Sequence, residues 1–253
     1  MIANADSPGH NITVQPELAP QWLQKLASLQ EDSLQNFLPN RRPEEFNLPE
    51  PKATKHAAVL VLFGGGASPA DGGAASADVP ADASVLLTHR HPGMRSHSGQ
   101  IAFPGGRIDA TDRSPVDTAL REAWEETGLN RNNVTPLKQF RDLAIPVTGN
   151  QVHPVLSYWD TPSSVDVTSP DEADDVFTVA VSDLLAPENR FAIKHGSWTG
   201  PAFSVRDYVV WGFTAGLLNA IFHLSGWERE WDREKVFDLR ETLEKSRNNE
   251  ALR

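Results

Sequence analysis

Residues 57–63 are all Ala, Val, Leu or Phe, and they form the longest apolar run in the 253-residue chain. Such a run is far shorter than the ~20 residues needed to cross a bilayer. Because it has no polar alternation, it predicts a strand that is buried on both faces, as in a sheet covered on its two sides. Residues 85–88 predict the next strand.

Between these two strands, residues 64–84 are almost entirely Gly, Ala, Ser, Pro and Asp. A segment of this kind buries too little apolar area to offset the entropy lost on ordering it. We interpret it as a low-complexity hairpin loop inserted between two strands, not as a linker between domains. The predicted organisation is an N-terminal extension (1–55), one domain (56–226) and a charged C-terminal tail (227–253).

Periodicity and breaker residues predict the other elements. Helices are expected over residues 20–30 and 214–224, strands over residues 138–144, 152–159 and 176–181, and an extended connection over residues 39–51. The tail is expected to be helical, with Trp231, Leu239 and Leu243 facing inward, and Trp211 and Phe213 are expected in the core. Loosely alternating strands and helices favour a mixed α/β architecture.

The composition excludes several classes of function. The chain contains no cysteine, which rules out disulfides, thiolate metal sites and cysteine nucleophiles and fits a cytoplasmic location. Residues 1–11 show neither the basic cluster nor the apolar stretch of a signal peptide, and no membrane partner is expected. A formal net charge of −11 argues against a nucleic-acid partner, although a bound divalent metal would still let the chain bind polyanions.

The helix predicted over Pro115–Thr127 has the clearest boundaries. Ser114 is the expected N-cap, Pro115 occupies the first helical position, and Asp117 completes a Ser-x-x-Asp capping pattern. Gly128 is the expected C-terminal stop.

Three glutamates of this helix are spaced i, i+3 and i+4, so that Glu122, Glu125 and Glu126 project from one face. Like charges in this arrangement repel, and their obvious use is to bind a hard divalent cation. Arg121 is placed to pair with one carboxylate and fix its rotamer. The Gly-Gly turn that ends at Gly106 lets a backbone carbonyl approach the metal. From the spacing alone, a solvated acidic helix face is the competing interpretation.

The combination of Gly-Gly, a spacer and Arg-Glu-x-x-Glu-Glu-x-Gly resembles the Nudix box, whose second half matches residues 121–129. Counted from Gly106, the acid of the first half is Asp112 instead of Glu, and eight residues rather than seven separate it from Arg121. This departure leaves the role of Asp112 open. The resemblance implies the Nudix fold, an α/β (α+β) fold with an α/β/α sandwich around a mixed β-sheet.

A second motif lies upstream, where residues 86–106 read Leu-Leu-Thr-His-Arg-His-Pro-Gly-Met-Arg-Ser-His-Ser-Gly-Gln-Ile-Ala-Phe-Pro-Gly-Gly. This stretch resembles the motif of the coenzyme A pyrophosphatase branch of the family, with His91 as the one departure from its fixed positions. Residues 147–155 and 208–215 extend the likeness, which covers about residues 55–225.

Guanidinium groups bind phosphate bidentately, so Arg90 and Arg95 suit a phosphate-rich substrate, with His97 as a further contact. A structural ion pair is an equal alternative for Arg90. His89 and His91 are expected at the surface.

The resemblance implies Mg²⁺-dependent hydrolysis of the diphosphate of coenzyme A, or of a derivative, to 3′,5′-ADP and 4′-phosphopantetheine, with Mn²⁺ as an alternative metal. It implies a catalytic role for Glu122, Glu125, Glu126 and Arg121, and metal ligation by the three glutamates and the Gly106 carbonyl. Glu172 is a candidate auxiliary carboxylate, the alternative being an ordinary loop acid.

Two alternatives remain open: hydrolysis of another nucleoside diphosphate derivative, such as a dinucleotide cofactor or nucleotide sugar, and a Nudix-fold binding module without catalysis. Glu122, Glu125 and Glu126 argue against the binding module, because a protein without catalysis has no need for three carboxylates that repel one another. A homodimer is a further expectation, because dimers are common in this fold.

Overall fold

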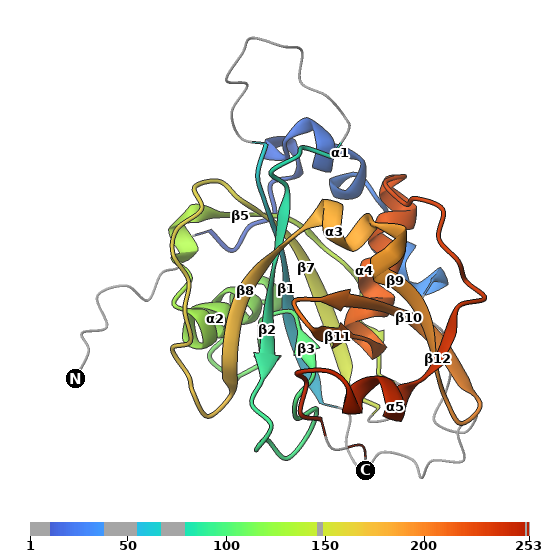
Figure 1. The fold of residues 1–253 in the computed structure, drawn as a ribbon. Helices are drawn as coiled ribbons and strands as arrows, with labels where there is room; N and C mark the ends of the chain where they lie inside the picture. Colours follow the sequence, from blue (N-terminus) through green and yellow to red (C-terminus); the bar gives the residue numbers. More distant parts are fainter. Residues whose placement is uncertain (1–10, 38–54, 67–78, 146–148, 251, 253) are drawn as a thin grey trace.

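The computed structural model describes residues 11–37, 55–66, 79–145, 149–250 and 252 (Figure 1). Its α-helices are α1 (Gln21–Ala27), α2 (Pro115–Thr127), α3 (Val181–Leu185), α4 (Gly212–Ser225) and α5 (Leu239–Glu244). Its strands are β1 (His56–Gly64), β2 (Ser84–Arg90), β3 (Ile101–Ala102), β4 (Gly105–Arg107), β5 (Val134–Gln139), β6 (Leu143–Ala144), β7 (Gln151–Trp159), β8 (Ala173–Ala180), β9 (Arg190–His195), β10 (Trp198–Val205), β11 (Tyr208–Val210) and β12 (Val236–Asp238). Short 3-10 helices are η2 (Pro16–Leu18), η3 (Ser33–Asn36), η5 (Arg131–Asn133) and η6 (Pro187–Asn189).

The large sheet is mixed. Within the described ranges it has eight strands, with the order β3-β2-β1-β7-β5 and with β4 paired to β1, β6 to β7 and β8 to β2. β1 runs parallel to β7 along its whole length and antiparallel to β2 and β4. Residues 60–64 of β1 are all buried, which confirms the prediction of a strand covered on both faces.

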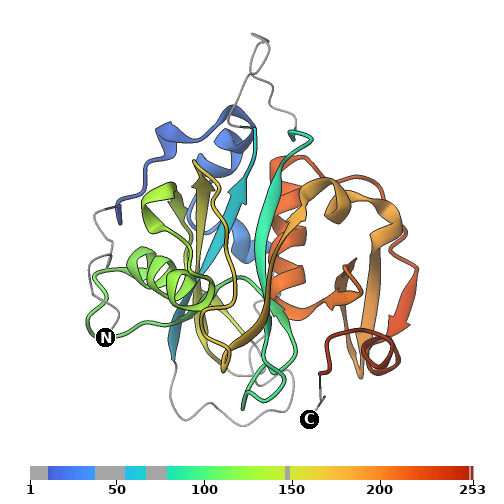
Figure 2. The same cartoon turned by 60° about the vertical axis from the view of Figure 1, so that its left-hand side comes forward.

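Successive side chains of β1 enter two different cores. Ala58, Leu60 and Leu62 pack with the apolar face of α2. Val61 and Phe63 instead join the core that includes α1 and α4. Figure 2 shows α2 and α4 on opposite sides of the large sheet. Because a strand points alternate side chains to opposite faces, a continuous apolar run is what this position requires. The predicted α/β/α sandwich around a mixed sheet is confirmed.

A second sheet was not predicted. In the described part of the chain its order is β11-β10-β9-β12, and it lies beyond α4, where the rings of Phe203 and Phe222 meet at a centroid distance of 6.0 Å. β10 contains Gly200 and Pro201, which weaken a strand signal in the sequence. Its hydrogen bonds to β9 and its packing on α4 compensate for this weak local preference.

In the described part of the C-terminal tail, the expected helix is present over α5 alone. β12 instead adds a strand to the second sheet, parallel to β9. Leu239 and Leu243 are buried as predicted. Trp231 is half-buried, with its ring centroid 4.7 Å from the Arg190 guanidinium carbon. After α5 the chain returns to the large sheet.

The other predicted elements are present with shifted ends. The N-terminal helix stops at Ala27, and the strand expected over residues 138–144 is divided between the end of β5 and β6. Trp211 and Phe213 are partly buried against the cores. Residues 39–51 and residues 67–78 of the predicted loop lie outside the described residues, but the antiparallel pairing of Phe63 with Val85 shows that this segment joins two adjacent strands. No helix among the described residues is long and apolar enough to cross a membrane.

Candidate active site

α2 begins and ends where the sequence predicts. The N–H of Asp117 donates to Ser114 Oγ at 3.2 Å, and Gly128 ends the helix in the left-handed region, with φ 68°. Val116, Leu120 and other apolar residues fix the helix over β1. The glutamate-bearing face is thereby held beside β4.

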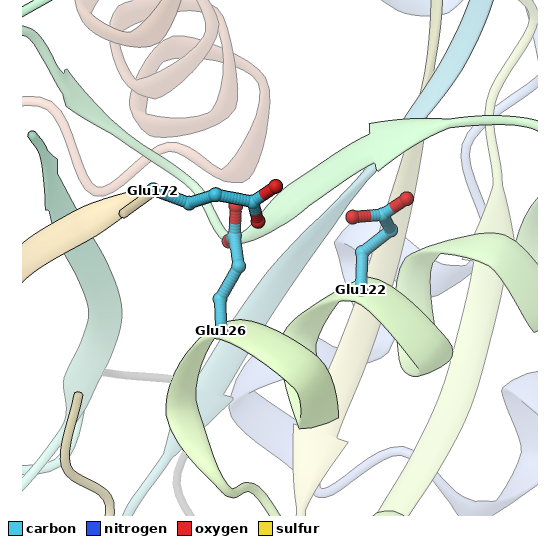
Figure 3. A group of neighbouring side chains, drawn as sticks. All are labelled: Glu122, Glu126 and Glu172. Atoms are coloured by element: carbon cyan, nitrogen blue, oxygen red, sulfur yellow. The ribbon is translucent and has the colours of Figure 1, made fainter. Parts of the chain in front are cut away.

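Three carboxylates converge at this position. Glu122, Glu126 and Glu172 each offer an oxygen, and these oxygens lie within 4.8 Å of one another. Glu122 and Glu126 project from the same side of α2, whereas Glu172 comes from the turn before β8 (Figure 3). Glu126 is only 3% exposed. Hard divalent cations prefer such a set of oxygen donors.

Ionising the carboxyl groups of this cluster costs free energy when no cation is bound. Burial raises the pKa of Glu126 to about 8, against the opposing effect of Arg90 and of the Gly105 N–H, which donates to Oε2 at 3.1 Å. Burial also raises the pKa of Glu122 to about 6, against the opposing effect of Arg121. Repulsion from Glu172 adds to both shifts. A divalent cation would compensate these charges locally.

Arg121 is held by a network that includes the acid left open by the box pattern. Its Nε and Nη2 donate to the two carboxylate oxygens of Asp112, each at 2.9 Å. Its Nη1 lies 2.9 Å from Glu122 Oε1 and 3.0 Å from Glu125 Oε2. The predicted pairing of Arg121 with a neighbouring carboxylate is therefore confirmed. Asp112 anchors the arginine, a role that the sequence left open.

The pKa of Asp112 reflects this anchoring. Burial alone would raise it, but hydrogen bonds from Arg121, the Asp109 N–H and the Thr118 hydroxyl outweigh burial and lower it. An ionised Asp112 therefore keeps Arg121 in place beside Glu122.

Glu125 and Gly106 were predicted as further metal ligands. The Glu125 side chain is 43% exposed and pairs with Arg121, and it is not one of the three convergent carboxylates. A Cβ on Gly106 would overlap the Glu122 carboxyl group, so glycine permits this close approach. Ligation by either residue stays a prediction.

The predicted phosphate-binding residues lie at the end of β2 and in the loop after it. Arg90 ends that strand, and its Nη1 lies 4.0 Å from Glu126 Oε1. Its Nε is buried and has no hydrogen-bond partner among the described residues. Arg95 is exposed in the loop of residues 91–99, which we call the motif loop. His97, in the same loop, has φ 54° and places Nδ1 3.0 Å from Gln100 Oε1, and burial lowers its pKa.

His89 is buried, so the prediction of a surface position was wrong. Its side chain contacts Asp174 through Nδ1, and its Nε2 lies 3.1 Å from the Gly99 carbonyl oxygen and 2.9 Å from that of Asn248. The C-terminal segment covers this end of β2, and no local pattern signals a contact between residues 159 apart. His91 is half-buried.

Comparisons with known proteins find Nudix proteins among the relatives of this chain. The NUDIX domain matches residues 74–199. A probable Nudix hydrolase of Schizosaccharomyces pombe is 33% identical over 140 residues, covering 54% of this chain and 49% of the yeast protein. Nudix hydrolase 3 of Caenorhabditis elegans is 33% identical over 131 residues, covering 50% and 54% of the two chains. This chain therefore spans about half the length of these two relatives.

A bacterial relative is matched over more of its length. The uncharacterized Nudix hydrolase NudL of Citrobacter koseri is 34% identical over 144 residues, covering 54% of this chain and 72% of NudL. Among solved structures, the Nudix hydrolase RenU from M. smegmatis is similar with a TM-score of 0.45 and 20% identity, over 71% of this chain and 90% of RenU.

The NUDIX domain match includes α2 and the Gly-Gly turn before it, and the NudL likeness covers more than two thirds of that protein. This chain belongs to the Nudix hydrolase family.

Proposed function

We propose that this protein hydrolyses the diphosphate linkage of coenzyme A or of one of its derivatives, giving 3′,5′-ADP and 4′-phosphopantetheine. The observation that carries the proposal is the convergence of Glu122, Glu126 and Glu172 with Arg90 beside Glu126. The motif of residues 86–106 supports coenzyme A as the substrate, because its arginines suit a molecule with three phosphate groups.

The donor set fits Mg²⁺, with Mn²⁺ as the alternative. Glu122, Glu126 and Glu172 would hold the ion, and Glu125 and the Gly106 carbonyl are further candidate ligands. When bound, the ion supplies Lewis acidity, which neutralises phosphate charge and makes a water molecule more acidic. The buried position of Glu126 favours such compensation.

The protein side chains would perform the remaining steps. A water oxygen attacks one phosphorus, the bond from that phosphorus to the bridging oxygen breaks, and the two phosphate monoesters separate. A carboxylate accepts the proton of the water, and both Glu125 and Glu172 are candidates for this role. The Arg90 guanidinium group, whose side chain is 19% exposed, would donate to a phosphate oxygen, while Arg121 keeps Glu122 in its rotamer.

Arg121→Lys is expected to lower kcat by about ten- to a hundredfold, because an ammonium group cannot make the bidentate pair with Asp112 and also orient Glu122. Steady-state kinetics at saturating Mg²⁺ measures the effect. Arg229→Lys, at an exposed position of the tail, is the matched control and should retain full activity. Equal activity of the two variants would contradict the positioning role of Arg121.

The substrate is tested by incubating the purified chain with Mg²⁺ and a panel of diphosphates, with products identified by mass spectrometry. Coenzyme A is expected to give 3′,5′-ADP and phosphopantetheine. Dephospho-coenzyme A, which lacks the 3′-phosphate, should show a KM about tenfold higher if the motif arginines recognise that group. Cleavage of a dinucleotide cofactor or a nucleotide sugar, with coenzyme A left intact, would refute the coenzyme A assignment but not hydrolysis. Tight binding of these compounds without cleavage would point to a non-catalytic module.

A further inference from the structure

The C-terminal residues Arg247–Glu250, which we call the C-terminal clasp, lie against the motif loop. Figure 1 shows the dark red segment after α5 beside the green ends of β2 and β3. The clasp lies outside the region that resembles the coenzyme A pyrophosphatase branch. Its contacts nevertheless fall on residues of that branch's motif.

Asn248 is the centre of the clasp and is fully buried. Its Nδ2 donates to the carbonyl oxygens of Gly99 and Val209, both at 3.0 Å. Its Oδ1 accepts from the Val209 N–H at 2.8 Å, and its backbone carbonyl oxygen lies 2.9 Å from His89 Nε2. One side chain thereby joins β11, in the second sheet, to the end of the motif loop.

Glu250 makes a second bridge. Its Oε1 accepts from Gln100 Nε2 at 2.7 Å, and its Oε2 accepts from Trp211 Nε1 at 2.8 Å. These bonds tie the residue that follows the motif loop to the residue that precedes α4. Both oxygens of the half-buried carboxylate therefore have a donor.

Gly99, the glycine of the motif, lies directly beneath the clasp. Its φ is +73°, and a Cβ would overlap the Asn248 carbonyl oxygen and lie 2.9 Å from Glu250 Cα. The clasp packs directly on the bare backbone of this residue. A side chain at position 99 would have to displace the clasp.

The same loop is connected to the catalytic cluster. Two backbone hydrogen bonds close the base of the loop. The Arg90 N–H donates to the Gln100 carbonyl oxygen at 2.9 Å, and the Gly99 N–H donates to the Arg90 carbonyl oxygen at 3.0 Å. At the other side, the His91 N–H donates to the Glu172 carbonyl oxygen at 2.9 Å. The loop that the clasp holds is thus anchored beside Arg90 and Glu172.

We infer that Asn248 and Glu250 are positioning residues for substrate binding, which hold the motif loop so that Arg95 and His97 meet the substrate in one arrangement. This inference rests on the proposed function, in which the motif loop binds substrate. Glu122 and Glu126 lie on α2, and within the part of the chain that the structure describes they form no hydrogen bond or ion pair with the clasp. Loss of the clasp should therefore weaken binding and leave the chemical step largely intact.

The first test does not depend on activity. Hydrogen exchange followed by mass spectrometry on the full chain compares the unmodified protein with Asn248→Ala, Glu250→Ala and the control Glu244→Ala, which changes an exposed residue of α5. In the first two variants the amides of residues 90–100 should exchange about tenfold faster, while those of α2 stay unchanged. Unchanged exchange in residues 90–100 would overturn the inference.

The second test separates positioning from a general loss of structure. With coenzyme A and Mg²⁺, Asn248→Ala and Glu250→Ala should raise KM about tenfold and keep kcat within about threefold. Glu250→Gln, which keeps one acceptor oxygen, should restore most of the affinity, and Glu244→Ala should match the unmodified protein. A fall in kcat with no change in KM, or no kinetic change despite faster exchange, would overturn the inference. If the unmodified protein cleaves no diphosphate, the proposed function fails, and the exchange experiment alone decides whether the clasp holds the loop.

Discussion

Replacing Glu126 with glutamine is expected to lower kcat/KM for the diphosphate substrate by about a thousandfold or more. Glu126 is the most buried of the three convergent carboxylates and lies beside Arg90. The substitution keeps the shape of the side chain and an oxygen that can accept from the Gly105 N–H. It removes the negative charge that a divalent cation would need. The measurement is hydrolysis under saturating Mg²⁺, and Glu188→Gln, at an exposed position in η6, is the matched control.

The stability of the same variant separates a functional role from a structural one. In the metal-free protein, Glu126→Gln should unfold at the same temperature or higher, because it removes the cost of burying an ionisable carboxyl group, to which repulsion from Glu122 and Glu172 adds. Added Mg²⁺ should raise the melting temperature of the unmodified protein more than that of the variant. Activity within tenfold of the unmodified protein would contradict the metal-binding role, and a collapse in stability would show that the carboxylate holds the fold.

The largest expected loss of stability follows Asp117→Asn, at about 3 kcal/mol. Asp117 Oδ1 accepts from Arg131 Nη2 at 2.7 Å, and the Arg131 side chain is only 4% exposed. The variant leaves that buried guanidinium without its counter-charge, and it weakens the bonds of Oδ2 to Arg113. Urea unfolding at pH 7 measures the difference. Asp183→Asn, at an exposed position in α3, should change stability by less than about 0.5 kcal/mol.

The contribution of Asp117 to the free energy of unfolding should also depend on pH. Burial alone would raise its pKa, but hydrogen bonds from Arg113 and Arg131 outweigh burial and lower it from 3.8 to about 2. A lowered carboxyl pKa stabilises the folded state above the unfolded value, and this contribution is lost as pH falls through the folded value. The difference between the unmodified protein and Asp117→Asn should therefore be constant above about pH 4 and shrink toward pH 2. A difference that stays constant down to pH 2 would contradict the ion pair.

Local signals in the sequence predicted the parts of the fold that depend on short-range contacts. The N-cap at Ser114, the proline after it and the glycine at position 128 define α2, because each acts on the helix end next to it. The apolar run of β1 predicted a doubly covered strand for a similar reason, since an unbroken apolar run makes both faces of the strand apolar.

The second sheet has no comparable local signal. β10 includes Gly200 and Pro201, and β12 is three exposed residues long. These strands exist because β9 lies between them and because α4 covers one side of the sheet. Propensity alone does not predict a strand whose stability comes from its neighbours.

The sequence by itself determined the family, the limits of α2 and the spacing that puts Glu122 and Glu126 on one helix face. Only the tertiary structure decided that the carboxylate of Glu172 lies beside them and that Asn248 covers His89. Side chains on one helix are related by its fixed geometry, which spacing reveals. Contacts between remote segments depend on how the whole sheet and its covering layers pack, and a single sequence does not display that packing.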